Sequence, residues 1–480
     1  MIEVVHMENN YELVIGLEIH IELKTKSKIF CSCSTEFGGE PNTRCCPVCM
    51  GYPGTMPTLN DKVLDLGIRA GISLNSEISN KSCMDRKNYF YPDLPKGYQI
   101  TQYDKPLCKN GYVDIGDKKI RIERIHIEED AGKLTYDENN NIYCEFNRCG
   151  IPLIEIVTKA DITSSDEAVR FLKKLKEIMI YSEVSDCHME KGELRCDVNV
   201  SVRKKGEISY GTRVEIKNVN SFQFIKKAID YEFKRQVNEI EEGNKIVCET
   251  RGFDSVKGKT YTMRIKETSD DYRYFREPDI PEIYISNDRI ENIRNKMTDS
   301  ADIRRNRYIN EFNLKLSEAD LLLNSKEIAD YFEECVKLTK RYDVVYKLLT
   351  GEIFRLLNGD NNIKISSKSL AKLSEYVYNG KVNVQTAIKV INILWNNSSK
   401  PVDDILNENN MWQINDESIL SKIIKDVLYK NGEIVEQVKS GNEKALKVLM
   451  GKAVKETNGY GNPVTINKLL SNMINIYKKG

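Results

Sequence analysis

Apolar and polar residues alternate along many short segments of the first 290 positions. In segment 17–23, LEIHIEL, every second residue is apolar, so a β-strand here would present Glu18, His20 and Glu22 together on its other face. Segments 193–203, 212–218 and 260–266 repeat this period of two. Turn-forming Gly, Pro, Asn and Asp bound these segments, and a helical period appears at 165–180 and 221–240. The first part is therefore predicted to be rich in β-strands, with a few helices.

The period changes to 3.6 residues from about position 300. Segments such as LSEADLLL at 316–323 have apolar residues spaced for one face of a helix, and the polar stretch 396–410 separates a last helical piece. A chain of 480 residues is also too long for a single core. We predict an α+β fold with an antiparallel-sheet domain at 1–295, an all-helical domain at 296–407 and a small helical domain at 408–480.

Charge is balanced over the whole chain, with 72 Lys and Arg against 72 Asp and Glu. Contact with a polyanion must then come from local patches, and the lysine excess of residues 411–480 favours that last piece. No window approaches the roughly 18 to 20 apolar residues that a membrane span needs, and the N-terminus lacks a secretory pattern. We expect a cytoplasmic protein with no membrane association.

Polar residues interrupt several strands where apolar residues would be expected. Asp197 lies in a Val-rich segment, and Glu155 divides the apolar run IPLIEIV. A buried carboxylate costs several kcal/mol unless a cation or metal compensates it. Carboxylates, one imidazole and nearby basic residues suit Mg²⁺ with a phosphorylated nucleotide, so we predict a metal and phosphate site on one face of a sheet. Surface salt bridges along a sheet would explain the same alternation.

Five of the thirteen cysteines lie within residues 31–49. Cys31 and Cys33 form a C-x-C pair, and Cys46 and Cys49 form C-P-x-C after twelve intervening residues. Two such knuckles can bring four thiolates to about 2.3 Å from one Zn²⁺, and the metal would be structural because four thiolates leave no open position. Cys45 is expected to be spare. Free thiols or a redox pair are the alternative.

Two stretches combine aromatic and basic residues. Segment 85–106 contains Lys87, Tyr89 and Tyr91, and segment 269–281 contains Arg273 and Tyr274. Aromatic rings beside guanidinium groups suit unpaired nucleotides, which stack on them. Ordinary loops packed on a sheet have the same composition, so both interpretations stay open.

A series of these motifs resembles a known family. The blocks are VIGLEIHIELKTKSKIFCSCS, EPNTRCCPVCMGYPGTMP, DRKNYFYPDLPKGYQ, IHIEEDAGK, FNRCGIPLIEIV, ELRCDVNVSVR, VEIKNVNSF and DDYRYFREPDIP. They are similar to the signature blocks of the B subunits of aspartyl/glutamyl-tRNA amidotransferases, and they follow one another in the family's order from residue 14 to about 281. The segment GNEKALKVLMGKAVKETNGYGNPVTINKLL resembles the family's tail domain.

The resemblance implies a fold and a reaction. The fold would be similar to the catalytic core of glutamine synthetase and guanidino kinases. The enzyme would be a carbon–nitrogen ligase with glutamine as amido donor. With ATP and Mg²⁺ it would phosphorylate the side-chain carboxylate of Glu misacylated on tRNA(Gln), or of Asp on tRNA(Asn). Ammonia from a glutaminase A subunit would then displace the phosphate, within a heterotrimer that also contains a C subunit.

The resemblance also implies roles for individual residues. The Mg²⁺ ligands would be Glu18, His20, Glu128 or Glu129, and Glu155. Asp197 and Glu215 are weaker catalytic candidates, and Arg264 would neutralise phosphate charge. Lys87, Lys96 and Glu129 would form the charged gate of an ammonia channel, and the substrate would contact Tyr89, Tyr91, Arg273 and Tyr274. Structural Zn²⁺ would be bound by Cys31, Cys33, Cys46 and Cys49, and the basic tail would contact tRNA.

Two other classes of protein compete with this interpretation. One is a zinc-containing, RNA-binding assembly subunit without kinase chemistry, against which the acidic residues within apolar strands argue, because binding RNA does not need them. The other is a carboxylate–amine ligase acting on a small metabolite, against which the helical tail and the aromatic-basic loops argue.

Overall fold

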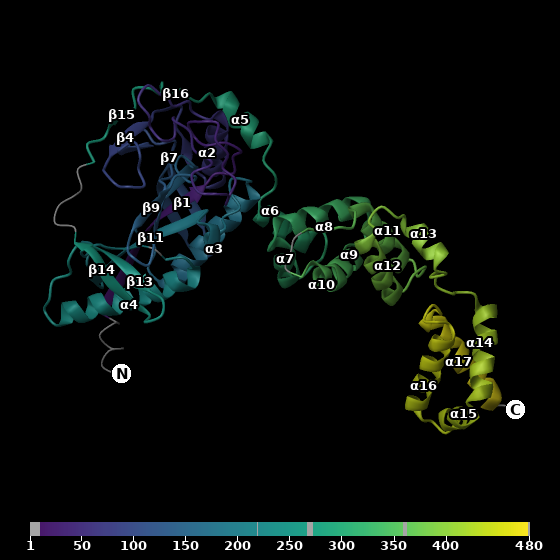
Figure 1. Cartoon of the computed structure of the whole chain (residues 1–480). Helices are drawn as coiled ribbons and strands as arrows, with labels where there is room; N and C mark the ends of the chain where they lie inside the picture. Colours follow the sequence, from purple (N-terminus) through teal and green to yellow (C-terminus); the bar gives the residue numbers. More distant parts are fainter. Residues whose placement is uncertain (1–9, 218, 266–271, 359–361, 479–480) are drawn as a thin grey trace. The chain divides into compact units, whose positions relative to one another are not determined.

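The computed structural model describes residues 10–217, 219–265, 272–358 and 362–478 of the chain (Figure 1). The chain divides into two compact units, residues 1–301 and 302–480. The predicted boundaries at 295 and 408 stay predictions.

A nine-stranded sheet is the centre of the first unit. Its strands are β1 (Tyr11–Glu22), β2 (Glu77–Ile78), β6 (Cys108–Asp114), β7 (Lys119–Glu129), β10 (Pro152–Thr158), β11 (Leu194–Lys204), β12 (Val214–Lys217), β13 (Glu249–Asp254) and β14 (Lys259–Ile265). Their order is β14-β13-β12-β11-β1-β10-β7-β6-β2. Neighbouring strands are antiparallel except for the parallel pair β12 and β13. The predicted antiparallel sheet is confirmed, and β1 lies near its middle.

One face of the sheet packs against helices α2 (Asp61–Ser73), α3 (Ser165–Tyr181) and α4 (Phe222–Glu241). Ile68, Phe171 and Ile225 of these helices belong to the same buried core as Leu17 and Ile19 of β1. The last two helices confirm the predicted segments 165–180 and 221–240. Each of the two begins after a serine whose hydroxyl accepts a hydrogen bond from a backbone N–H of the first turn, which stabilises the start of the helix.

Smaller sheets lie beside the main one. The three-stranded sheet β15-β4-β5 contains β4 (Asp85–Asn88), β5 (Tyr98–Thr101) and β15 (Phe275–Arg276). The backbone N–H of Ile100 donates to Glu129 Oε1 at 2.8 Å, which ties β5 to the end of β7. Two short pairs complete the set: β3 (Lys81–Ser82) with β16 (Ile283–Tyr284), and β8 (Lys133–Tyr136) with β9 (Ile142–Glu145). Helix α5 (Asn287–Asn295) follows β16.

The second unit is helical where it is described, which confirms the predicted helical region. Its helices are α6 (Ala301–Asn310), α7 (Leu316–Leu323), α8 (Lys326–Leu338), α9 (Tyr342–Leu348), α10 (Phe354–Leu357), α11 (Ser367–Tyr378), α12 (Val384–Asn396), α13 (Val402–Glu408), α14 (Glu417–Lys430), α15 (Gly432–Lys439), α16 (Glu443–Glu456) and α17 (Pro463–Lys478). The last four share a core that includes Leu420, Leu449 and Leu470. Among the residues described, none of the helices combines the length and apolar character that crossing a bilayer demands.

Candidate functional site

Four neighbouring strands contribute polar side chains to the face of the sheet opposite the helices. Glu18 of β1 lies across from Asp197 of β11, and His20 lies across from Glu155 of β10. Glu155 in turn lies across from His126 of β7. Residues directly opposite each other on adjacent strands point to the same side, so these side chains gather on one surface. The polar residues that alternate with apolar ones in β1 therefore lie beside polar residues of β10 and β11.

Two histidines and two glutamates alternate at the centre of this surface. His20 Nε2 lies 3.3 Å from Glu128 Oε1 and 3.5 Å from Glu155 Oε2. His126 Nε2 lies 3.0 Å from Glu155 Oε2 and 3.6 Å from Glu128 Oε2. Both carboxylates are buried, at 2% and 7% exposure. The predicted ligands Glu18, His20 and Glu155 have ligand atoms within 4.8 Å of one another, as do His126, Glu128 and Glu155.

The charge on each of these four side chains depends on the charges of the other three. Burial favours a neutral His126, but the carboxylates of Glu155 and Glu128 outweigh it and raise its pKa to about 9. Burial also opposes the charge on Glu128, yet His126 and His20 lower the pKa of its carboxyl to about 2. Burial and the nearby Glu155 raise the pKa of Glu18. The surface thus concentrates negative charge that needs protons or a cation to balance it.

This donor set fits a divalent cation. Carboxylate oxygens are the preferred ligands of Mg²⁺, and imidazole nitrogens widen the choice to Mn²⁺ and other transition metals. Within the described part of the chain, the buried His126 Nδ1 makes no hydrogen bond, so the orientation of that ring rests on its contacts with the two glutamates through Nε2.

Basic residues surround the acidic cluster at a cavity of about 320 Å³. Lys217 Nζ lies 2.5 Å from Asp197 Oδ2 and 3.1 Å from Glu215 Oε1. Arg195 Nη2 donates to Asp130 Oδ2 at 2.7 Å. The cavity wall includes Glu18, His20, Lys87, Tyr89, Glu128, Asp130, Arg195, Asp197 and Lys217. The site therefore has acidic groups beside cations, which is the combination that a metal-bound phosphate requires.

Four residues of this site were not singled out from the sequence. They are His126, Asp130, Arg195 and Lys217. The motif IHIEED did carry a signal for His126, because His126 and Glu128 are two positions apart and therefore lie on the same face of β7. Arg195 and Lys217 occupy the polar positions of segments 193–203 and 212–218, where salt bridges were the competing explanation.

Glu128 and Glu129 point to opposite sides of the sheet. Glu128 joins the two histidines, whereas Glu129 accepts hydrogen bonds from Lys96 Nζ at 2.5 Å, and both side chains of that pair are nearly fully buried. Of the two alternatives for a metal ligand, the geometry favours Glu128. Lys87 lines the larger cavity, with its ammonium 4.7 Å from the centre of the Tyr272 ring, while Lys96 and Glu129 line a separate cavity of about 70 Å³. Of the three predicted gate residues, Lys96 and Glu129 thus lie together, and Lys87 lines the other cavity.

Two predicted catalytic residues lie toward the outer end of the polar face. Glu215 of β12 lies opposite Thr250 of β13 and accepts a hydrogen bond from its hydroxyl. Thr250 in turn lies opposite Arg264 of β14, so all three side chains are on this face. Arg264 is exposed on the edge strand β14, outside the cavity wall. Glu215 is therefore the nearer of the two to the acidic cluster.

The four predicted substrate contacts differ in whether they line the cavity. Tyr89 lines the cavity, whereas Tyr91 is exposed. Tyr274 stacks on Tyr103 with ring centres 4.2 Å apart, and the Arg273 carbonyl accepts a hydrogen bond from Asn88. Of these predicted contacts, Tyr89 is thus the one that belongs to the cavity wall.

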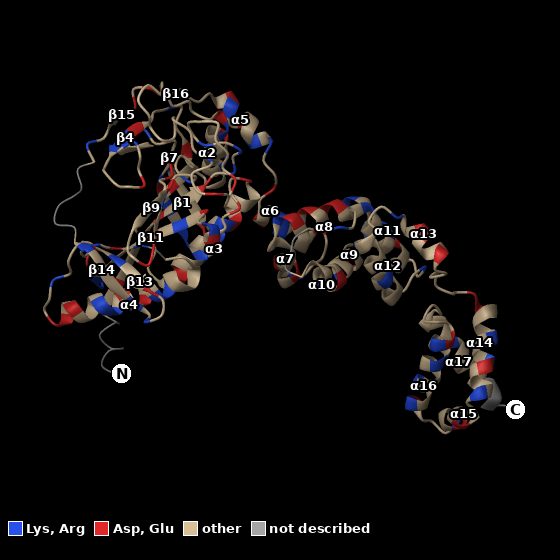
Figure 2. Ribbon diagram, in the orientation of Figure 1, with Lys and Arg blue, Asp and Glu red and all other residues tan. Residues whose placement is uncertain are grey.

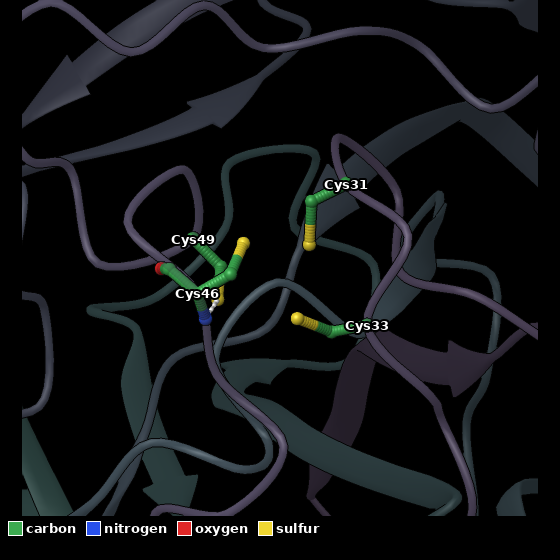
Figure 3. A group of neighbouring side chains, drawn as sticks. All are labelled: Cys31, Cys33, Cys46 and Cys49. Atoms are coloured by element: carbon green, nitrogen blue, oxygen red, sulfur yellow. Dashed lines mark hydrogen bonds between the residues drawn. The ribbon is translucent and has the colours of Figure 1, made fainter.

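The four predicted zinc ligands lie together (Figure 3). The sulfur atoms of Cys31, Cys33, Cys46 and Cys49 are within 4.8 Å of one another. The Cys46 backbone N–H donates to Cys49 Sγ at 3.1 Å, whereas the Cys45 thiol contacts the Asn42 carbonyl instead. The Cys31 thiol, followed by the Cys46 backbone and Lys28, lowers the pKa of Cys49 to about 5 against the effect of burial. Four sulfurs at this spacing fit one tetrahedral Zn²⁺.

Comparison with known proteins identifies the class of this fold and site. Residues 13–291 match the family model described as the GatB/GatE catalytic domain, and residues 330–474 match the model described as the GatB domain. The catalytic-domain match covers all nine strands of the main sheet except the first two residues of β1, and it contains the acidic cluster.

Curated relatives extend this match along nearly the whole chain. The B subunit of the aspartyl/glutamyl-tRNA(Asn/Gln) amidotransferase of Caldicellulosiruptor bescii is 49% identical over 472 residues, which cover 96% of this chain and 98% of the relative. The proteins of the same name from Thermoanaerobacter pseudethanolicus and Clostridium botulinum are 47% and 44% identical over the same shares. The chain belongs to the family of aspartyl/glutamyl-tRNA amidotransferase B subunits. The resemblance predicted from the motifs, and with it the expected enzyme class, is confirmed.

Proposed function

We propose that this chain activates and amidates the side-chain carboxylate of Glu on tRNA(Gln), of Asp on tRNA(Asn), or of both. The γ-phosphoryl group of ATP would be transferred to a carboxylate oxygen, and ammonia would then attack the acyl carbon and release phosphate. A carboxylate is a poor acyl donor until one oxygen becomes a phosphate leaving group. The observation that carries the proposal is the cluster of His20, His126, Glu128 and Glu155. Through His20 and Glu128 it reaches a cavity whose wall also contains basic residues.

The acidic cluster would hold the divalent cation of the reaction. Glu18, His20, Glu128 and Glu155 are the proposed ligands, and Glu129 is left to its buried pair with Lys96. Bound Mg²⁺ would neutralise charge on the phosphate oxygens of ATP. His126 would keep Glu155 and Glu128 in place through its Nε2 contacts.

The basic residues at the cavity would bind the phosphate groups. Lys217 is already oriented by Asp197 and Glu215, so these two carboxylates act in this proposal by positioning that ammonium group. Arg195 and Lys87 lie on the same cavity wall. Arg264 remains a proposed phosphate contact at the outer end of the same face. Buried groups fixed in advance stabilise developing charge better than water does, because they need not reorganise.

The aromatic residues near β4 would bind the aminoacylated end of the tRNA. Tyr89 lines the cavity, and the stacked pair of Tyr274 with Tyr103 lies in the adjoining segments. Tyr91 and Arg273 are the other proposed substrate contacts. Base stacking on aromatic rings tolerates different nucleotides, which suits the terminal unpaired bases of a tRNA.

The first unit is further proposed to share the core arrangement of glutamine synthetase and the guanidino kinases. An antiparallel sheet with helices on one face and acidic residues on the other supports this comparison. In each of these proteins the group to be phosphorylated, a carboxylate or a guanidino group, would bind next to ATP on the polar face of the sheet.

The names of the relatives imply partners for this chain. As a B subunit it is proposed to work in a heterotrimer with a glutaminase A subunit and a C subunit. The buried pair of Lys96 with Glu129 would be part of the entrance for ammonia, with Lys87 on the catalytic side. Lysines recur along α14 and α16 of the tail (Figure 2), and this basic region would contact the tRNA away from its acceptor end. The cysteine cluster would bind structural Zn²⁺.

One substitution tests the kinase step. The complex of all three subunits is given Glu-tRNA(Gln) and ATP labelled in the γ-phosphate, and phosphate release is measured. Glu155→Gln should lower release by about 100-fold or more while tRNA affinity changes little, because a metal ligand is lost and the RNA contacts are not. Glu12→Gln, on the same strand as Glu18 and paired with Arg203, is the matched control. Undiminished release in Glu155→Gln would reject the metal site.

The same assay separates the competing functions. An assembly subunit without kinase chemistry would bind the charged tRNA but give no phosphate release above that of the partner subunits alone. A ligase for a small metabolite would release phosphate with free glutamate or aspartate in place of the charged tRNA. The buried carboxylates favour the tRNA-dependent kinase over the first alternative.

A further inference from the structure

Lys28 is a fully buried lysine beside the cysteine cluster. Its side chain has 0% exposure, and its ammonium lies 3.8 Å from Cys49 Sγ and donates to the Phe146 carbonyl at 3.2 Å. Among the residues that the structure describes, the partners of this ammonium are the Cys49 sulfur and the Phe146 carbonyl, and no Asp or Glu pairs with it. A buried ammonium without a counter-charge is costly, so its position next to a sulfur needs a physical reason.

The packing around Lys28 keeps its side chain directed at Cys49. Gly150 adopts a positive φ of +81°, and a Cβ at this position would lie 3.5 Å from Cys49 Cβ and 3.6 Å from Lys28 Cδ. The Ile29 backbone N–H donates to the Gly150 carbonyl at 3.0 Å, and the Cys149 thiol donates to the Cys49 carbonyl at 3.4 Å. The chain segment 146–150 therefore holds the lysine stem and the second cysteine knuckle together.

A metal held by four thiolates explains why a cation lies there. Four thiolates around Zn²⁺ carry a net charge of about −2, which is unfavourable in a buried environment. Cys49 is itself buried and already receives the Cys46 backbone N–H. A neighbouring ammonium halves the net charge of the site and acts on the most enclosed of its four sulfurs.

We propose that Lys28 is the built-in counter-cation of the four-cysteine metal site and that it strengthens the binding of Zn²⁺. The role is that of a positioning and charge-balancing residue, because the ammonium contacts the Cys49 sulfur and has no lone pair with which to bind a metal. The proposal concerns the metal site alone and does not depend on the amidation reaction.

The test measures zinc affinity in the full-length chain. Apo-protein is titrated with Zn²⁺ in competition with a chromophoric chelator. Lys28→Met keeps the length of the side chain and removes its charge, and we expect about 10- to 100-fold weaker binding, as for other groups adjacent to metal ligands. Lys26→Met is the matched control, because Lys26 is exposed and lies two residues away in the same segment. Binding by Lys28→Met that equals the wild-type affinity overturns the proposal, as does a wild-type chain that binds no Zn²⁺.

Two further measurements separate charge from packing. The Co²⁺-loaded Lys28→Met protein should keep the absorption of a tetrahedral thiolate site, since the four ligands are intact. If Lys28→Met does not fold, Lys28→Met with Cys49→Ser is compared with Cys49→Ser alone. Because the double variant lacks both the Cys49 thiolate and the Lys28 ammonium, it should fold. Its zinc affinity should be nearly the same as that of Cys49→Ser. If Lys28→Met weakens zinc binding further in the Cys49→Ser protein, the ammonium does not act through the Cys49 sulfur, and the proposal fails.

Discussion

A buried ion pair anchors the small sheet that forms one wall of the cavity. Arg86 of β4 donates to Glu277 through Nε at 2.7 Å and Nη2 at 2.8 Å, and Glu277 has 0% exposure. The guanidinium also lies 4.3 Å from the centre of the Tyr98 ring. Among the residues that the structure describes, Glu277→Ala would leave Arg86 facing a buried space with Asp279, at 3.4 Å, as its remaining acidic contact.

The expected cost follows from these contacts. Removing one partner of a buried pair costs about 3 to 5 kcal/mol, and the partial exposure of Arg86 together with Asp279 favours the lower end, about 3 kcal/mol. In thermal unfolding followed by calorimetry, this corresponds to a midpoint lowered by about 5 °C for the transition of the first unit, because the entropy of unfolding grows with the roughly 300 residues of that unit. Hydrogen exchange of the amides in β4 should quicken as well, because Arg86 is part of that strand.

Glu282→Ala is the matched control for this prediction. Glu282 also pairs with an arginine, Arg276, and with Lys81, but these partners are largely exposed to solvent. Exposed pairs are screened by water, so the midpoint should fall much less than in Glu277→Ala. Equal midpoints in the two variants, or an unchanged exchange rate in β4 of Glu277→Ala, would refute the reasoning.

Two other predictions concern the cysteine cluster. Gly51→Ala would place a methyl group 2.3 Å from Lys96 Cγ, and its thermal midpoint should fall below that of Gly54→Ala, a glycine that also has a positive φ but faces open space. The difference between the two should be about 1 to 3 kcal/mol, and no difference would contradict the contact with Lys96. Cys33→Ser should lower the zinc content measured by atomic absorption from about one ion per chain, while Cys45→Ser should retain it; equal loss in both would reject the ligand assignment.

Local patterns in the sequence predicted several strands of the site but not which of their residues lie beside one another. The alternation in β1 placed Glu18 and His20 on one face, and this needed only the geometry of a single strand. The register that brings Glu155 and Arg195 beside His20 joins positions that are far apart in the sequence, and no local rule specifies it. His126 then follows from its pairing with Glu155. The cross-strand partners therefore had to come from the structure.

The choice between Glu128 and Glu129 shows a second limit. Alternation predicts that the two point to opposite sides, but a sequence does not say which side faces the site when both side chains are buried. The pairing of β10 with β7 also shifts by one residue between Val157 and Thr158. Beyond such a shift, the residue opposite a given position cannot be found by counting along the strand.

The cysteine cluster was predictable because its spacing is local. Cys31, Cys33, Cys46 and Cys49 lie within one short segment, and the turn between the two pairs limits where the sulfurs can go. Lys28 gave no such signal, since lysine is ordinarily a surface residue. Its burial arises from segment 146–150, which is distant in sequence and covers it in the folded chain.

The position of β1 has a consequence for synthesis of this protein on the ribosome. Of the strands that the structure describes, β1 emerges before all others. Its two neighbours are β10 and β11, and β10 begins roughly 130 residues after β1 ends. At a translation rate of about 5 to 20 residues per second, about 6 to 26 s pass before β10 begins to be synthesised. During this time both edges of β1 are unpaired and its Leu and Ile side chains are uncovered. A ribosome-associated chaperone that shields apolar nascent segments should therefore engage this chain early and release it only after residue 204 has emerged.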